Sequence, residues 1–255
     1  MFRTFLCLIA SSRRLLYLHS PVCCRAHLKN SLPTLLAHPF RSIMTSMRLN
    51  FAISVLAIGV VSAQQPAEAE LSRVAEAMDA ALDVRPGAII ADIGTGLAVQ
   101  HPIRITGKVG PDGKVVCVEI APAAVARIRT QAEAQHVPNL QVVLGIEDDP
   151  KLASGAFDAI LVSNTYHEFS QPSAMLKRLC DALKPRGRLV VVENYTPAGR
   201  SDSRADQAKR HDMAPENLEP ELAAGGFVIK ERIEPILTDP AGRIRYLVRA
   251  ARANP

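Results

Sequence analysis

Acidic residues are missing from the first quarter of the chain, and this absence decides what the net charge means. The chain has 255 residues, of which 30 are basic and 25 acidic, and its formal net charge is +5. Up to Ala67 there are seven basic residues and no acid, so the rest has 23 basic residues against 25 acidic ones. The positive charge therefore belongs to the N-terminal segment, and we expect no nucleic-acid partner.

Cysteine is scarce outside the same segment. Three of the five cysteines lie within it, which leaves Cys117 in a predicted strand and Cys180 in a predicted helix. Two isolated thiols form neither a zinc site nor a disulfide framework, and a free buried cysteine usually packs as a small apolar residue. The sequence pattern therefore assigns no metal ligands.

The N-terminal apolar run is too short for a permanent membrane anchor. Arg48 follows Met47, residues 51–61 are apolar, and Val61-Ser62-Ala63 places small residues where a signal peptidase cuts. Eleven apolar positions are too few to cross a bilayer as a helix. We predict a signal peptide over 47–63 and an exported protein, periplasmic or secreted, with no stable membrane span after its removal.

Residues 1–43 leave a second interpretation open. They are rich in Arg, Ser and Leu, which is typical of an organelle transit peptide, so a mitochondrial or other organelle location is the alternative. They could equally be translated upstream sequence, with the true start at Met44 or Met47. The predicted organisation is a leader over 1–63, a linker over 64–70 and a folded domain over 71–255.

The folded part is organised around the stretch from Ala88 to Gly96. An apolar run that ends in Asp92 is typical of a buried strand in a parallel sheet. Gly94 and Gly96 lack a Cβ, so the backbone can turn sharply there and approach a ligand. An acid at the carboxyl end of such a strand favours a ligand with hydroxyl or ammonium groups, which indicates a nucleoside-type cofactor.

Strands and helices alternate along the rest of the domain. The last two strands are joined by a short turn, which predicts an antiparallel pair. Pro102 interrupts the helix expected after Gly96, so this helix either begins near Pro102 or is kinked. The first predicted strand ends at Asp92, and the later ones cover 114–119, 140–144, 157–163, 188–193, 227–232 and 243–249. The other predicted helices cover 71–82, 122–136, 175–183 and 215–224.

Polar residues follow several of these strands at the edge where such sheets bind ligands. Glu119 can accept two hydrogen bonds from ribose hydroxyls, or can simply be a solvated strand end. The acidic loop 147–150 either contacts the base of a cofactor or is a solvated turn. His167 is a candidate base, or packs the loop by hydrogen bonding. The polar segment 196–212 is long enough to be a lid.

Taken in order, these blocks resemble the class I methyltransferases that use S-adenosylmethionine. Residues 92–96 look like the first motif of the family, Glu119 matches its ribose acid, and residues 157–161 and 183–189 are similar to later motifs. Tyr166-His167-Glu168-Phe169, with residues 211–213, looks like an exported bacterial-type subgroup. The implied fold is α/β: a Rossmann-like, seven-stranded, mostly parallel sheet with helices on both faces and an antiparallel strand near the edge.

The resemblance implies an S-adenosylmethionine-dependent enzyme that methylates an unidentified small-molecule acceptor. It places Asp92 near the methionine amino group and Glu119 on the ribose hydroxyls, with His167 as a base for an acceptor that must lose a proton. The assigned residues are His167 and Tyr166 for catalysis, Asp92, Gly94, Gly96, Glu119, Asp148 and Asn164 for the cofactor, and His211 for the substrate.

Three positions depart from the family pattern and bear on cofactor affinity. The third glycine position falls on Leu97 or Ala98, His101-Pro102 interrupts the following helix, and the acid after the third strand falls on Ile146 unless Glu147 or Asp148 replaces it.

Two other functions compete with methyl transfer. A degenerate, non-catalytic module with the same fold would bind a different ligand or partner. An NAD(P)-dependent oxidoreductase ranks lower, because Val99 occupies the third glycine position of its Gly-x-Gly-x-x-Gly motif.

Overall fold

The computed structural model of the protein describes residues 70–96 and 99–253. The predicted leader, its signal peptide and nearly all of the predicted linker lie outside these residues, as do Leu97 and Ala98, and the expectations for them stay predictions. Within the described part of the chain, none of the helices is long and apolar enough to cross a membrane.

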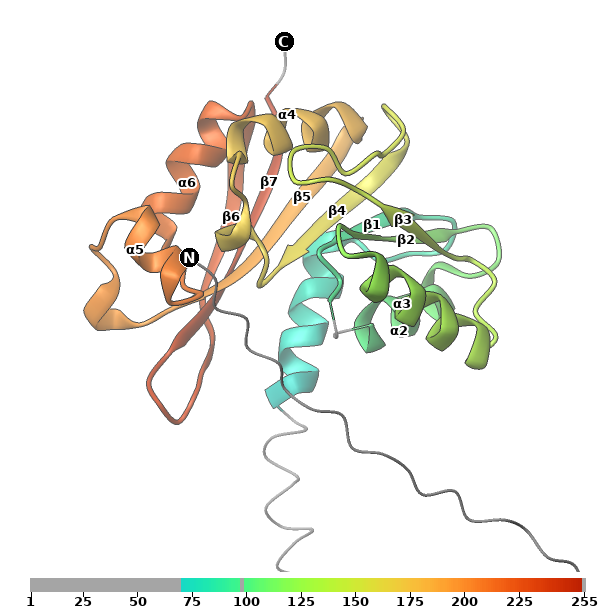
Figure 1. The fold of residues 1–255 in the computed structure, drawn as a ribbon, viewed down its shortest axis with the longest axis horizontal. Coiled ribbons are helices and arrows are strands. Elements are labelled where there is room, and N and C mark those ends of the chain that lie inside the picture. The colour runs from blue at the N-terminus through green and yellow to red at the C-terminus, as the bar shows by residue number, and fades with distance from the viewer. Residues whose placement is uncertain (1–69, 97–98, 254–255) are drawn as a thin grey trace, which may run out of the picture. The chain divides into compact units, whose positions relative to one another are not determined.

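Seven strands form one sheet in the order β3-β2-β1-β4-β5-β7-β6 (Figure 1). Strands β3, β2, β1, β4 and β5 pair in parallel, whereas β7 pairs antiparallel with both β5 and β6. The predicted fold class is thereby confirmed. The strands are β1 (Ile89–Ile93), β2 (Lys114–Glu119), β3 (Leu140–Leu144), β4 (Phe157–Ser163), β5 (Leu183–Tyr195), β6 (Phe227–Thr238) and β7 (Ile244–Arg252).

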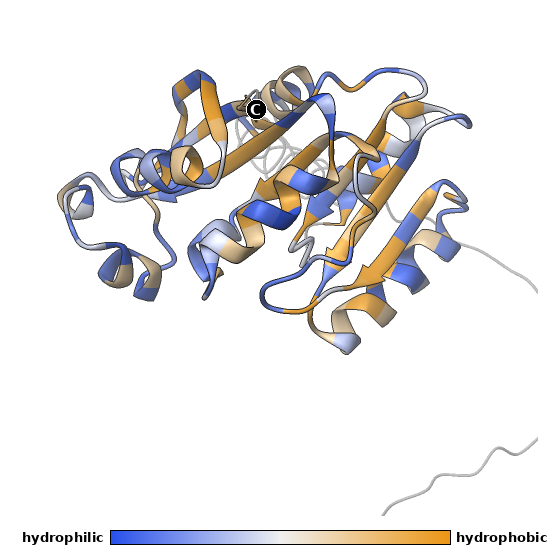
Figure 2. Ribbon diagram, turned by 90° about the horizontal axis from the view of Figure 1, so that it is seen from above, coloured by the Kyte–Doolittle hydropathy of each residue, from blue (hydrophilic) through white to orange (hydrophobic). Residues whose placement is uncertain are grey.

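The central strands are apolar along their whole length because helices cover both faces of the sheet. In β1, Ile90 belongs to an apolar cluster with residues of helix 70–82 and of α2 (Gln100–Val109). The next residue, Ala91, belongs to another cluster with residues of α4 (Pro172–Ala182) and α6 (Pro215–Ala224). Helix α3 (Pro122–Ala134) covers β2 and β3. Apolar residues gather in the strands, while the helices carry polar residues on their outer sides (Figure 2).

The structure corrects the limits of three predicted elements. Strand β6 continues to Thr238 because Ile233, Ile236 and Leu237 still pack on the core. Helix α4 ends at Ala182, since Leu183, the first residue of β5, already pairs with Phe157 of β4. Pairing resumes at Arg188, so residues 184–187, which lie between the predicted helix and the predicted strand, bulge out within a single strand.

The helix after the glycine loop tolerates its proline. Helix α2 begins at Gln100, so Pro102 lies in the first turn, where backbone N–H groups have no partner within the helix. His101 is the second residue of this helix, and its Nε2 lies 3.2 Å from Asp79 Oδ1.

Asp79 connects helix 70–82 to α2. Arg104 donates to both of its carboxylate oxygens at 2.6 and 2.7 Å, and Lys108 donates to one at 2.6 Å. Burial alone raises the pKa of Asp79, but the hydrogen bonds from His101, Arg104 and Lys108 outweigh it and hold the pKa well below its usual range. The ionised carboxylate therefore stabilises the fold.

Replacing this carboxylate should weaken the packing of the two helices. We expect Asp79→Ala to lower the free energy of unfolding by roughly 1.5–3 kcal/mol, the usual loss for hydrogen bonds to a charged group. Because the pKa of Asp79 is lowered in the folded state, its contribution is present above pH 3.8 and is lost as pH falls further. Urea denaturation at pH 7 and at pH 3 measures both effects, with the exposed Glu133→Ala as the control. Equal denaturation midpoints for Asp79→Ala and wild type at pH 7 would contradict this account.

Candidate functional site

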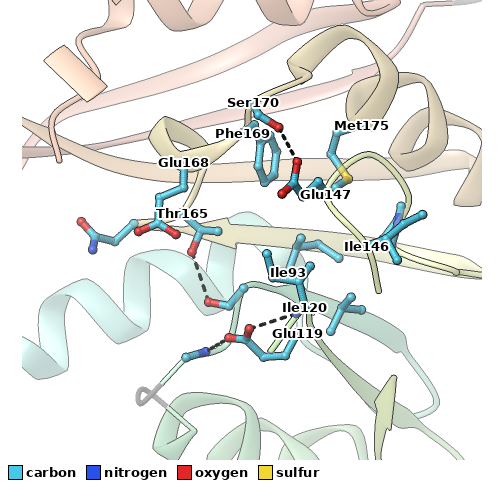
Figure 3. Close-up of a pocket in the computed structure, with 15 residues that line it drawn as sticks. Ile93, Glu119, Ile120, Ile146, Glu147, Thr165, Glu168, Phe169, Ser170 and Met175 are labelled. Carbon is cyan, nitrogen blue, oxygen red and sulfur yellow. Dashed lines mark hydrogen bonds between the residues drawn. The ribbon is translucent and has the colours of Figure 1, made fainter. Parts of the chain in front are cut away.

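A pocket of about 320 Å³ lies at the carboxyl edge of the parallel strands (Figure 3). This volume is within the range of about 300–1,000 Å³ that is common for small-molecule sites. The loops after β1, β2, β3 and β4 all contribute, together with Met175 of α4. The residues used below are Gly94, Gly96, Glu119, Ile120, Ile146, Glu147, Asn164, Thr165 and Glu168.

The glycine loop after β1 turns as the sequence predicts. Gly94 and Gly96 have φ values of 68° and 57°, in the left-handed region that favours glycine. The Gly94 N–H donates to Val118 O at 2.9 Å, which joins the loop to β2. The close approach at Gly94 is to protein, because Thr165 Oγ1 donates to Gly94 O at 3.1 Å and a Cβ on Gly94 would overlap the Thr165 side chain.

Glu119 holds the other end of this loop. One carboxylate oxygen accepts a hydrogen bond from the Gly96 N–H, and the second accepts from the Ile120 N–H at 3.2 Å (Figure 3). An ionised carboxylate has about four lone-pair positions, so roughly two remain for a ligand. Glu119 therefore fixes the loop and still presents acceptors to the pocket that it lines.

Asp92 lines a second, more open hollow of about 690 Å³ beside helix 70–82. The side chain is buried, and burial raises the pKa of Asp92 to about 6, an effect that the nearby His101 and Thr95 only partly offset. The two hollows share Gly94, Gly96, Asn164 and Thr165. An elongated ligand that crosses the glycine loop would contact both.

Asn164 follows β4 in a left-handed conformation with φ 52°. Its side-chain oxygen accepts from Asn194 Nδ2 at 2.6 Å, and Arg245 Nε donates to Asn194 Oδ1 at 2.8 Å, so the loop is tied to β5 and through it to β7. Asn164 thus lines the same pocket as Gly94 and Glu119, and its cofactor role stays a prediction.

The acidic loop after β3 contributes Glu147 to the pocket, the neighbour of the predicted cofactor residue Asp148. Ile146 and Glu147 line the pocket, and Ser170 Oγ donates to Glu147 Oε2 at 3.3 Å, whereas Asp148 is not among the lining residues. The isolated bridge between Ile146 and Asp149 turns this loop sharply, which directs adjacent side chains apart. The cofactor role of Asp148 stays a prediction.

Tyr166 faces away from the pocket. Its hydroxyl donates to Glu221 of α6 at 2.9 Å, and burial raises the pKa of Tyr166 far above its usual value. The side chain is fully buried in the core beside Phe169. The structure therefore does not bring Tyr166 together with the residues around Glu119.

His167 is buried next to the pocket and is held by Glu193. Its Nδ1 lies 3.0 and 3.2 Å from the two carboxylate oxygens of Glu193, whose side chain is fully buried at the end of β5. Burial alone lowers the pKa of His167, but the hydrogen bond to Glu193 and its charge raise it above the usual value. His167 Nε2 lies 3.3 Å from Nδ1 of the exposed His211.

Glu193 was not assigned a role from the sequence, although a pattern in the sequence points to it. It closes the apolar run of the predicted strand 188–193 with an acid, as Asp92 and Glu119 close theirs. The predicted lid over 196–212 folds as two short helices, η2 (Pro197–Gly199) and α5 (Arg204–Lys209), and none of the residues that line the first pocket comes from this segment.

Residues 92–189 match a protein family described as a methyltransferase domain. The match begins at Asp92 and ends at Leu189 in β5, so it includes the loops that carry Glu119, Glu147 and Asn164. Together with the fold, it supports a class I S-adenosylmethionine-dependent methyltransferase.

Curated relatives are similar to less than half of this chain. Nocamycin O-methyltransferase of Saccharothrix syringae is 32% identical over 117 residues, which are 46% of this chain and 41% of that protein. A demethylmenaquinone methyltransferase of Thermus thermophilus is 33% identical over 127 residues, which are 48% of this chain and 53% of that protein. The chain thus spans about half the length of the curated relatives it matches.

Solved structures share the fold at low sequence identity. A SAM-dependent methyltransferase from Aquifex aeolicus has a TM-score of 0.58 at 19% identity, covering 69% of this chain and 88% of that one. The [4+2]-cyclase SpnF has a TM-score of 0.61 at 16% identity, covering 72% and 82%. A geranyl diphosphate methyltransferase in complex with SAM has a TM-score of 0.58 at 14% identity, covering 70% and 84%. With the domain match, these likenesses support S-adenosylmethionine as the cofactor.

The contact of Gly94 with Thr165 gives a mutational test of the loop. We expect Gly94→Ala to destabilise the protein by at least about 1–2 kcal/mol, the cost of a left-handed non-glycine residue, because the overlap with Thr165 adds to it. Gly107→Ala in α2 is the control, since a Cβ there meets open space and should stabilise by about 0.5–1 kcal/mol. Chemical denaturation measures both changes. A Gly94→Ala protein as stable as wild type would show that the loop relaxes freely.

We expect the ionised form of Asp92 to destabilise the fold, in contrast to that of Asp79. Since its pKa rises from 3.8 to about 6 in the folded protein, its ionised form is unfavourable, and stability is lost as pH rises through this window. We expect Asp92→Asn to raise the free energy of unfolding by on the order of 2–3 kcal/mol at pH 7 and by almost nothing at pH 3.5. Thermal melts across this pH range test the expectation, and a difference that is independent of pH would exclude ionisation as its cause.

Proposed function

We propose that this protein is an S-adenosylmethionine-dependent methyltransferase that acts on a small-molecule acceptor. The observation that carries the proposal is the placement of Glu119, whose carboxylate fixes the Gly94–Gly96 loop and lines the pocket at the same time. A ligand with two adjacent hydroxyl groups fits the remaining acceptors of this carboxylate.

The other residues around this pocket fit the rest of a nucleoside. Ile120 and Ile146 expose 55% and 49% of their surface although they line a pocket, so a flat base would cover apolar area that now faces water. Glu147 also lines the pocket, and its carboxylate can accept from an exocyclic amine.

Asp92 fits the amino-acid end of the same ligand. It lies across the glycine loop from Glu119, and its buried carboxylate is unfavourable when ionised without a cationic partner. A bound ammonium group would favour the ionised form and lower the pKa of Asp92 toward its usual value. The high pKa is therefore consistent with a site prepared for a cation.

S-adenosylmethionine supplies a methyl group that is bonded to a sulfonium sulfur. The methyl group passes to a nucleophile, and the sulfur keeps the electrons of the broken bond. The chain contributes chiefly by orienting the two reactants, which can account for up to roughly 7–11 kcal/mol of the barrier. Glu119 and the glycine loop hold the cofactor, and His167 and His211, next to Glu168, face the methyl acceptor.

The acceptor side of the site is assigned to His167 and His211. His167 presents Nε2 toward His211, and Glu168 between them also lines the pocket. Two of the curated relatives are named for small-molecule methylation, of nocamycin and of demethylmenaquinone, which supports a small-molecule acceptor.

Calorimetric titration of the full chain with S-adenosylmethionine, and separately with its demethylated product, tests the proposal. We expect saturable binding in the micromolar range, about −8 kcal/mol. Glu119→Gln should weaken it at least tenfold, because the amide keeps one acceptor for the Gly96 N–H but loses acceptors for the hydroxyls. The exposed Glu133→Gln on α3 should bind as wild type does. A folded protein that binds neither compound would favour the non-catalytic module instead.

A further inference from the structure

Three metal-ligating side chains converge beside the pocket, and the proposed function does not require their convergence. They are His167, Glu168 and His211, whose ligand atoms all lie within 4.8 Å of one another. His167 Nε2 lies 3.3 Å from His211 Nδ1, and Glu168 Oε1 lies 3.8 Å from the first nitrogen and 3.9 Å from the second. His167 and Glu168 come from the turn η1 (Tyr166–Glu168), and His211 follows α5.

These separations suit a metal ion with four ligands. With bonds of about 2.0–2.1 Å to imidazole nitrogen, two ligands of a tetrahedral ion lie about 3.3–3.4 Å apart. The two imidazole nitrogens already have this separation. Glu168 needs to move by only about half an ångström, and its side chain is 61% exposed, so rotation about its single bonds is unhindered by packing.

Glu193 fixes His167 in the orientation that a metal ligand needs. Its carboxylate accepts from the backbone N–H of His167 at 3.2 Å and lies 3.0 Å from the ring Nδ1. When Nδ1–H donates to this carboxylate, the neutral ring presents the lone pair of Nε2 toward His211 and Glu168. A carboxylate behind a metal-bound histidine is a common arrangement, and it strengthens the ligand.

His211 is held from its backbone while its ring stays accessible. Its carbonyl oxygen accepts from Arg243 at 2.8 Å, and the same guanidinium donates to the buried Asp212 at 2.5 Å. The His211 side chain is 70% exposed, which gives an ion a path from solvent. The backbone of His211 is therefore fixed, while its ring is accessible to solvent.

We propose that His167 Nε2, His211 Nδ1 and the Glu168 carboxylate bind one divalent transition-metal ion at the edge of the pocket. Two imidazoles and one carboxylate suit zinc, cobalt or iron, whereas magnesium and calcium prefer oxygen ligands only. Three protein ligands leave at least one coordination position open. Since Glu168 also lines the pocket, this open position is available to water or to an oxygen or sulfur of the acceptor.

Co²⁺ is the probe, because its visible absorption reports the number and type of its ligands. We expect one Co²⁺ per full-length chain, with the spectrum of a four- or five-coordinate site of nitrogen and oxygen ligands, displaced by Zn²⁺ but not by millimolar Mg²⁺. S-adenosylmethionine is left out of this titration. Glu119→Gln should bind Co²⁺ as wild type does, so the metal site and the cofactor site can fail separately.

Variants of the two exposed ligands identify the site. His211→Ala and Glu168→Gln should each weaken Co²⁺ binding at least tenfold, while His136→Ala and Glu133→Gln, exposed residues of the same types elsewhere, should leave it unchanged. The N-terminal segment contains further histidines and cysteines, and the single-residue comparisons on the full chain separate their contribution.

A second comparison addresses Glu193 as a positioning residue. Glu193→Gln keeps the shape of the side chain but removes its charge, and we expect an intermediate loss of Co²⁺ affinity with the same ligand spectrum. Equal Co²⁺ affinity in wild type, His211→Ala and Glu168→Gln would overturn the proposal. The absence of saturable binding by the folded wild-type chain, or a spectrum with thiolate ligands, would overturn it as well.

Discussion

The parallel pairing of β1 between β2 and β4 is the constraint on which the site depends. Because the three strands run in the same direction, their carboxyl ends meet at one edge of the sheet, and Asp92, Glu119 and Asn164 arrive there together. Backbone hydrogen bonds continue the ladder past the strand ends. Gly94 N donates to Val118 O of β2 at 2.9 Å, and Asn164 N donates to Val192 O of β5 at 2.7 Å. The loops are thus held by the same ladder that holds the sheet.

Buried acids carry a cost that the fold offsets in different ways. Asp79 is surrounded by cationic partners, so its pKa falls and its charge stabilises the protein. Glu193 is fully buried against His167, whereas the nearby His101 and Thr95 only partly offset the burial of Asp92, whose pKa rises to about 6. Strain and unfavourable charge of this kind concentrate where a ligand completes the site. The contrast between Asp79 and Asp92 separates a structural carboxylate from one that is available to a ligand.

The seven strands and their order of appearance could be predicted, because each central strand is an uninterrupted apolar run bounded by turn residues. The limits of β5, β6 and α4 could not, since they depend on pairing with Phe157 and on packing against the distant helix 70–82. Gly94, Gly96, Glu119 and Asn164 could be placed at this pocket from their positions at or just after the ends of strands, while their roles stay predictions. Glu147 rather than Asp148 lines the pocket because of a local turn that no periodic pattern records.

The sequence by itself determined the architecture and the edge of the sheet where the pocket lies, because apolar periodicity, glycine and the acids that end strands are local properties of the chain. Only the tertiary structure decided how side chains far apart in the chain meet. His167 and His211 are separated by 44 residues, and Tyr166 and Glu221 by 55, and nothing local specifies either contact. Tyr166 and His167 are adjacent, yet Tyr166 points toward α6 and His167 points toward Glu193. Packing on opposite sides of the turn fixes each side-chain rotamer.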